Sequence, residues 1–230
     1  FATYGEYLWE EYKYGRDQAD LKGLEDLSVY LGNKQGVRKN VIRFDYADRE
    51  QMFDEISYHK GGRILHMLRK TVGDEAFFEA LRLYLIRHAY KTAEIHDLRI
   101  VFEEVSGMDL NWFFNQWFLT SGHPVLNIQT SYNSDKKEIL LEIVQDQNLS
   151  EAPLYRIPMA VDIYADGKSL RKQIVLDKQR QSFVFTSATP PDLVNVDAEK
   201  YILGKKNEIK TMQQYLFQYK NAPLFMDRFE

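Results

Sequence analysis

The sequence contains no cysteine, and this absence excludes a disulfide framework, a cysteine-based zinc site and a cysteine nucleophile. It also contains no apolar run of roughly 18 residues, so we expect no membrane-spanning segment. The 30 basic and 34 acidic residues are interspersed and give a net charge of -4. No basic stripe is present to follow a phosphate backbone, so we expect no nucleic-acid partner. These absences leave the compartment open between cytoplasm and periplasm.

The first residues lack an initiator Met, a signal-peptide pattern and a helix cap. Phe1, Tyr4, Leu8 and Tyr12 nevertheless recur at helical spacing, and Gly15 marks a stop. The sequence therefore predicts an amphipathic helix that is already running at residue 1. We expect a missing upstream part of the same polypeptide to precede it.

Hydrophobic periodicity predicts an α+β multidomain chain that divides near residue 122. Apolar residues follow helical spacing up to about residue 119 and alternate after Gly122. In the first part, helices are predicted over residues 74–89, 92–107 and 108–119. We expect these helices to have the caps Asp74, Thr92 and Asp109 and a stop at Gly107.

The second part contains six segments of strand length that are rich in Val, Ile, Phe and Tyr. They cover residues 125–132, 138–145, 157–165, 169–176, 181–186 and 192–197. Turn residues at 133–136 and 166–167 favour antiparallel hairpins. The sequence thus predicts a helical domain over 1–122, a small antiparallel β-sandwich over 123–203, and a return to helices over 204–230.

The histidines form no helical zinc pair, which needs two histidines four residues apart with a glutamate beside the first. His59 and His66 are about two helical turns apart, roughly 10 Å, which is too far to share one metal ion. We therefore expect structural or solvated roles for all five histidines, which are His59, His66, His88, His96 and His123.

The segment 56–68 is unusual because a predicted helix carries Gly61 and Gly62 near its start. Glycine in a helix costs about 1 kcal/mol against alanine, and such a pair usually marks close backbone approach. Tyr58 would lie at the entrance of this helix with its hydroxyl free to face a cleft. A packing or surface role is the alternative, since the chain has 15 tyrosines.

Taken together, these residues resemble the aminopeptidase N-like family of zinc metallopeptidases, whose catalytic domain is thermolysin-like. Phe1–Tyr4 is similar to the run that follows the family's Asn-Glu-Gly triplet. Tyr58–Gly61 is similar to its Tyr-x-Lys-Gly motif, with His59 where Glu is usual. Asn111–Leu126 is similar to its Trp followed by Gly-x-Pro, and 218–230 is similar to the opening of a helical, HEAT-like domain.

The resemblance implies a zinc-dependent aminopeptidase that hydrolyses the amino-terminal bond of peptide substrates. Its zinc ligands and catalytic Glu would lie upstream of Phe1, so the chain alone would bind no zinc and be inactive. Residues 1–122 would be the carboxyl-side part of the catalytic domain. Tyr58 would be catalytic and donate to the oxyanion of the tetrahedral intermediate. Phe53 would line the substrate cleft.

Two other functional hypotheses compete with the aminopeptidase hypothesis. The parent could be a non-catalytic scaffold of the same fold that binds other proteins, because function depends on the site and not on the fold. Retention of Tyr58, Lys60 and Gly61 favours the enzyme. A carbohydrate-binding or adhesion role for the sandwich lacks an aromatic platform or a calcium-loop spacing in support.

Overall fold

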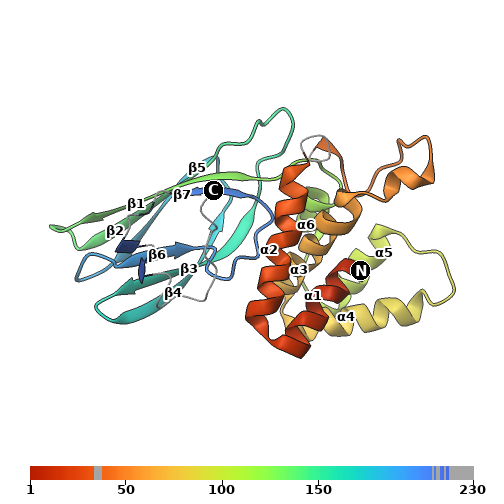
Figure 1. Cartoon of the computed structure of the whole chain (residues 1–230), viewed down its shortest axis with the longest axis horizontal. Coiled ribbons are helices and arrows are strands. Elements are labelled where there is room, and N and C mark those ends of the chain that lie inside the picture. Colours follow the sequence, from red (N-terminus) through yellow and green to blue (C-terminus); the bar gives the residue numbers. More distant parts are fainter. Residues whose placement is uncertain (34–37, 209, 211–212, 215, 218–230) are drawn as a thin grey trace. The chain divides into compact units, whose positions relative to one another are not determined.

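The computed structural model describes residues 1–33, 38–208, 210, 213–214 and 216–217. The chain divides into two compact units (Figure 1). The first contains Phe1–Glu6 and Asp26–Gly122, and the second contains Tyr7–Glu25 and His123–Glu230. The boundary at Gly122 lies where the periodicity changes, although the sequence did not predict that Tyr7–Glu25 would group with the strands. The assignment of domains remains a prediction.

The labelled α-helices of the described chain fall before residue 118. They are α1 (Ala2–Tyr14), α2 (Arg16–Gly32), α3 (Gly61–Val72), α4 (Asp74–Arg87), α5 (Ile95–Ser106) and α6 (Asn111–Trp117). Two short turns precede α3, the 3-10 turn η2 (Arg49–Met52) and the π-helical turn η3 (Ile56–Lys60). The Gly5 amide donates to the Phe1 carbonyl at 2.8 Å, so helical bonding in α1 includes the first residue, as predicted.

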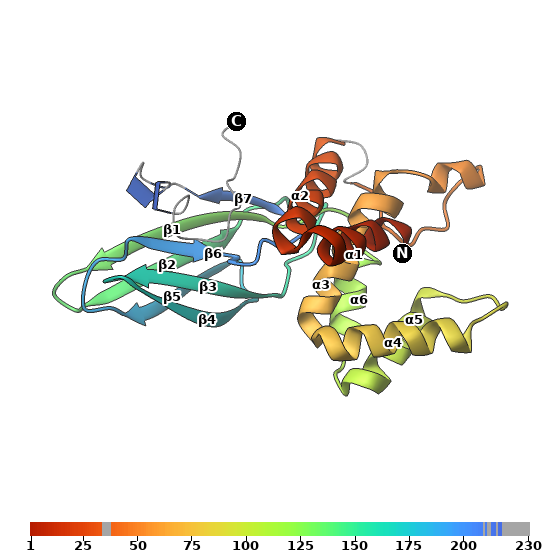
Figure 2. The same cartoon turned by 60° about the horizontal axis from the view of Figure 1, so that its bottom comes forward.

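Helix α3 forms the centre of the first unit, and its residues from Gly62 to Arg69 are all buried. The start of α1 crosses α3 (Figure 2), where a Cβ on Gly62 would lie 3.3 Å from the Thr3 Cγ2. The predicted close approach is therefore confirmed at Gly62. The Phe77 ring joins this centre to α1 and α5, since it makes edge contacts with Tyr4 and Phe102.

The caps of α4 and α5 are not the residues that the sequence predicted. Gly73 caps α4, and Asp74 instead pairs with Arg69 through bonds of 2.8 and 2.9 Å. Glu94 caps α5 in place of Thr92. The chain is extended at Glu94, and the Asp97 carboxylate accepts a hydrogen bond from the Glu94 amide at 2.8 Å. A capping side chain must lie within reach of the first-turn amides, and Thr92 comes two residues too early.

The predicted stop of α5 is confirmed, whereas the predicted cap of α6 is not. Gly107 ends α5 in the left-handed conformation, with φ of 68°, as expected for a helix stop. At α6, which begins at Asn111, the cap position is Leu110, so the prediction of Asp109 as the cap is wrong by one residue. Asp109, the predicted cap, lies one residue earlier and accepts a bond from the Asn111 amide at 2.9 Å.

The second unit contains a β-sandwich with sheets ordered β5-β2-β1-β7 and β4-β3-β6 (Figure 1). The strands are β1 (Val125–Asn133), β2 (Glu138–Gln145), β3 (Ile157–Ala165), β4 (Lys168–Leu176), β5 (Arg180–Thr186), β6 (Leu193–Val196) and β7 (Lys205–Glu208). The hairpins β1–β2 and β3–β4 are antiparallel, as predicted. Asp166 and Gly167 join β3 to β4 with φ of 52° and 68°, the conformation that a two-residue hairpin turn requires.

Strand β7 was not predicted, and it corrects the end of the sandwich at residue 203. It pairs in parallel with β1, from Val125 opposite Lys205 to Ile128 opposite Glu208. The Lys205 amide donates to the Pro124 carbonyl at 2.9 Å and starts this pairing. Residues 213–214 and 216–217 are helical, and most of the other residues of the predicted terminal helices lie outside the described part of the chain.

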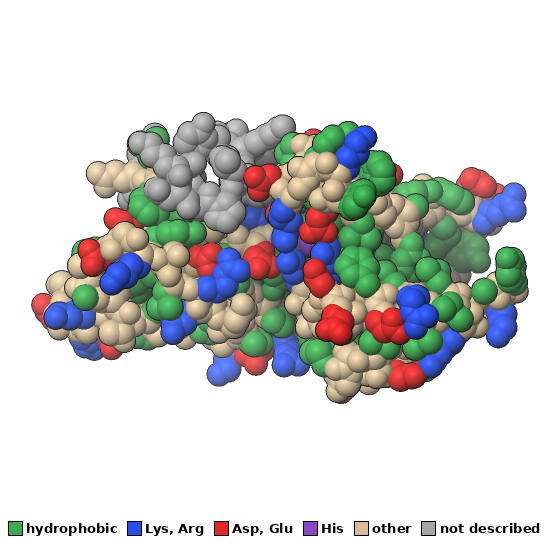
Figure 3. Space-filling model, turned by 90° about the horizontal axis from the view of Figure 1, so that it is seen from below, with side chains coloured by type: hydrophobic (Ala, Val, Ile, Leu, Met, Phe, Trp, Pro, Cys, Tyr) green, Lys and Arg blue, Asp and Glu red, His purple; other side chains and the backbone are tan. Residues whose placement is uncertain are grey.

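Charged side chains of both signs are interspersed over the face of the molecule shown in Figure 3, as the composition suggested. None of the described helices has both the length and the apolar character that a bilayer span requires.

Candidate functional site

Tyr58 lies in the middle of the π-helical turn η3, which leads directly into α3. Its amide donates to the Asp54 carbonyl at 3.1 Å, whereas its side chain is 42% exposed. Among the described residues, no hydrogen bond engages the Tyr58 hydroxyl. π-helical turns are rare and often occur at functional sites. The phenol is therefore available to a ligand at the surface.

Phe53, the other predicted site residue, follows η2 and is 65% exposed. Its ring centroid lies 6.3 Å from that of Tyr58, and the two planes are inclined by 39°. The structure thus brings the two predicted residues together on one surface. The pair presents an apolar ring beside a hydroxyl donor, and the roles of both residues remain predictions.

Asp54 holds the start of the turn. Its Oδ1 accepts from the Ser57 amide at 3.0 Å, and its Oδ2 accepts from the Arg43 guanidinium at 2.7 Å. Arg43 is fixed in turn by bonds to the carbonyls of Asn40 and Gln51. Partial burial opposes ionisation of Asp54, but the Ser57 amide and Arg43 outweigh it and lower the pKa of the carboxyl. The start of η3 is therefore held by a carboxylate.

His59 forms a second attachment. Its Nδ1 lies 2.9 Å from the Asp26 Oδ1 on α2. The expected structural role of this histidine agrees with that contact. This pair has no local sequence signal, because the two residues are 33 positions apart.

Lys60 forms a third attachment, and its side chain is 1% exposed. Its Nζ donates to the carbonyls of Thr120 and Gly122, both at 3.2 Å, and lies 5.8 Å from the centroid of the Tyr30 ring. The Tyr30 hydroxyl donates to the same Gly122 carbonyl at 3.0 Å. Burial lowers the pKa of Lys60 to about 8. Sequence reasoning treated this lysine only as part of a motif.

The described residues do not fit a zinc site. No group of three or more His, Asp or Glu side chains among them could hold a metal ion. His66 is buried on α3, where its Nδ1 lies 3.1 Å from the Tyr4 hydroxyl, and His59 contacts Asp26. These two histidines therefore have separate partners and do not converge.

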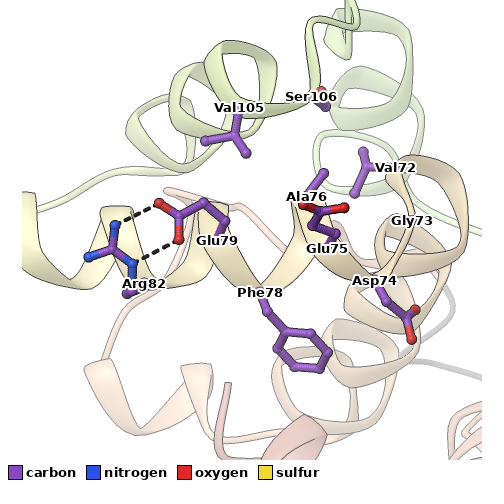
Figure 4. A pocket seen from close by; sticks show the side chains of 10 residues that line it. All are labelled: Val72, Gly73, Asp74, Glu75, Ala76, Phe78, Glu79, Arg82, Val105 and Ser106. Carbon is purple, nitrogen blue, oxygen red and sulfur yellow. Dashed lines mark hydrogen bonds and ion pairs between the residues drawn. The ribbon is translucent and has the colours of Figure 1, made fainter.

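A surface hollow of about 860 Å³ lies elsewhere in the first unit (Figure 4). It is lined mainly by α4, with Val72 from α3 and Val105 and Ser106 from α5. Two of its charged side chains, Glu79 and Arg82, bind each other through two bonds of 2.6 and 2.8 Å. Neither Tyr58 nor Phe53 lines this hollow, so it does not belong to the candidate site.

The described fold is a helical region that is followed along the chain by a β-sandwich. Residues 1–117 match the peptidase family M1 domain, which is just over half of the 230 residues. The chain belongs to peptidase family M1, and the resemblance found in the sequence is confirmed.

Curated relatives agree with this membership. The leucyl aminopeptidase of Saccharolobus solfataricus is 34% identical over 155 residues, which are 66% of this chain and 19% of the relative. The aminopeptidase N of Lactococcus lactis is 36% identical over 125 residues, which are 52% of this chain and 15% of the relative. The aligned part of this chain thus spans a fifth or less of these proteins.

A solved structure supports the fold class. The aminopeptidase A of Legionella pneumophila, solved in complex with aspartic acid, superposes with a TM-score of 0.75 at 21% identity. The match covers 96% of this chain and 25% of that protein. The predicted α+β architecture is therefore confirmed.

Proposed function

We propose that this chain is part of a zinc-dependent aminopeptidase that hydrolyses the amino-terminal bond of peptide substrates. Membership of peptidase family M1 and the names of the curated relatives support this function. The zinc ligands would lie outside the described residues, since no group among them fits a metal ion. The chain alone would then be inactive, and the full-length protein would be the active species.

Tyr58 would act on the reacting carbonyl in this enzyme. Water adds to the carbonyl carbon, the carbonyl electron pair moves to oxygen, and the Tyr58 hydroxyl donates a hydrogen bond to the resulting oxyanion. Collapse of this intermediate breaks the carbon–nitrogen bond, and the amine leaves with a proton. The observation that carries the proposal is an exposed hydroxyl, with no hydrogen bond among the described residues, on a turn held at three points.

Phe53 would contribute to substrate binding in the same site. Its exposed ring lies beside Tyr58, where it can contact an apolar part of the peptide while the hydroxyl faces the carbonyl. Such a contact is made equally in the ground state and the transition state, so it would affect KM more than kcat.

Steady-state kinetics of the full-length protein with Tyr58→Phe tests this function. Loss of one oxyanion donor costs about 3 kcal/mol, which is roughly a hundredfold or more in kcat, with little change in KM. Tyr90→Phe is the matched control, because Tyr90 is also exposed and lies in the connection between α4 and α5. Wild-type kcat in the Tyr58→Phe variant would exclude the proposed role.

The alternative is a non-catalytic scaffold of the same family. Absence of turnover by the zinc-loaded full-length protein would favour the scaffold and return Tyr58 to a surface role.

A further inference from the structure

Lys60 occupies an environment that lysine rarely adopts. Lysine is almost never fully buried unless it is paired, because removing an ammonium group from water is costly. The partners of Lys60 are the neutral carbonyls of Thr120 and Gly122 and the face of the Tyr30 ring. No carboxylate within the described part of the chain binds its Nζ. Methionine would fill the same space without this cost, so packing alone does not explain the residue.

We propose that Lys60 is a positioning residue that holds the Tyr58 hydroxyl at the reacting carbonyl. This inference rests on the proposed function. Lys60 is the last residue of η3, and the Gly61 amide that follows donates to the carbonyls of Ile56 and Tyr58. The backbone that closes the turn therefore bonds directly to Tyr58. A shift of Lys60 moves the residue that carries the phenol.

The segment that receives Lys60 is itself fixed. The Gly122 carbonyl accepts from both Lys60 and the Tyr30 hydroxyl, so one oxygen connects η3 with α2. Burial raises the pKa of Tyr30, which therefore remains a donor throughout the physiological range. The attachments at Asp54 and His59 fix the start and the α2 side of the same turn. Lys60 supplies the only one of these three attachments that reaches the residues after α6.

The experiment is a double-mutant cycle in the full-length protein, with kcat and KM measured on an amino-acid 4-nitroanilide. Lys60→Met is made alone and in the Tyr58→Phe background. Displacing a reacting group by about 1 Å can cost a hundredfold, so Lys60→Met alone should lower kcat by about 10- to 100-fold and change KM by less than about twofold. In the Tyr58→Phe background, Lys60→Met should lower kcat by less than about threefold, because the effect of Lys60 would pass through the hydroxyl that this background lacks.

Lys200→Met is the matched control. Lys200 is also buried, at 7% exposure, and its Nζ donates to the Asn195 Oδ1 at 2.9 Å in the sandwich unit. Its replacement should lower the melting temperature and leave kcat unchanged. If Lys60→Met fails to fold, as judged by circular dichroism, Lys60→Gln takes its place. Glutamine retains a hydrogen-bond donor of shorter reach than lysine. The same kcat criterion applies to this variant.

The outcomes separate this inference from the proposed function. A large effect of Lys60→Met that disappears in the Tyr58→Phe background supports positioning. An effect of equal size in both backgrounds, or no effect in either, overturns positioning while the Tyr58→Phe loss sustains the function. Absence of turnover by the wild-type protein overturns both.

Discussion

Replacing Asp54 by alanine should loosen the turn that carries Tyr58. The substitution removes the acceptor of the Ser57 amide, at 3.0 Å, and the partner of Arg43, at 2.7 Å. Loss of a hydrogen bond to a backbone amide costs about 1 kcal/mol, and loss of a charged hydrogen bond costs about 1.5 kcal/mol. Since the two contributions overlap, we expect the free energy of local opening to fall by about 2 kcal/mol. The open population should then rise roughly 30-fold.

Hydrogen–deuterium exchange of the full-length protein measures this opening at residues 57–61. We expect about 30-fold faster exchange there in Asp54→Ala, because exchange follows the population of the open state. Asp109→Ala is the control, since Asp109 also accepts from a backbone amide, that of Asn111, but is exposed and forms no ion pair with an arginine in the described structure. It should leave η3 unchanged. Unaltered exchange at residues 57–61 in Asp54→Ala would show that the Asp54 carboxylate does not hold this turn closed.

The pH dependence of the same exchange follows from the lowered pKa of Asp54. The folded-state pKa lies below the ordinary value of 3.8, so the carboxylate contributes its full stabilisation above that pH. The contribution is lost as the pH falls through the folded-state pKa. The difference between wild type and Asp54→Ala should therefore be constant near neutral pH and narrow below about pH 3.8.

Three further predictions concern the substrate, the sandwich and the metal. Phe53→Ala should raise KM about fivefold, a loss of about 1 kcal/mol, with little change in kcat; a lower kcat at unchanged KM would contradict the binding role. Gly204→Ala should destabilise the β1–β7 edge by about 1 to 3 kcal/mol in thermal unfolding, because its Cβ would lie 2.8 Å from the Pro124 carbonyl oxygen. Gly5→Ala, where nothing lies within 4 Å, should be neutral or stabilising. The isolated chain should bind no zinc in calorimetry at neutral pH. Stoichiometric zinc binding would contradict this and show that the chain itself contains a set of zinc ligands.

The six predicted strands were recognisable because alternation and turn residues are local signals. Asp166 and Gly167 adopt the positive φ values that their residue types favour, and they fix the β3–β4 hairpin. Strand β7 has the sequence Lys-Lys-Asn-Glu and no apolar alternation. It forms because the Lys205 amide donates to the Pro124 carbonyl and the strand then pairs with β1, about 80 positions earlier in the chain. Such pairing is set by tertiary structure and leaves no local pattern.

The candidate site was only partly predictable. Gly61 and Gly62 were the sequence signal that indicated a site near Tyr58, and Gly62 indeed lies against α1. The π-helical form of the turn has no known sequence signal here, and its attachments join distant residues. Lys60 and Gly122, for example, are 62 positions apart. The caps of α4, α5 and α6 were misplaced by one, two and one residues, since several polar residues near each start could serve.

We propose that the full-length protein removes amino-terminal residues from peptides. Hydrolysis of a panel of amino-acid 4-nitroanilides tests it most directly when each substrate is compared with its N-acetylated form. We expect turnover of the free-amine substrates and none of their acetylated partners. Absence of turnover for the whole panel, or equal cleavage of free and acetylated substrates, would contradict it.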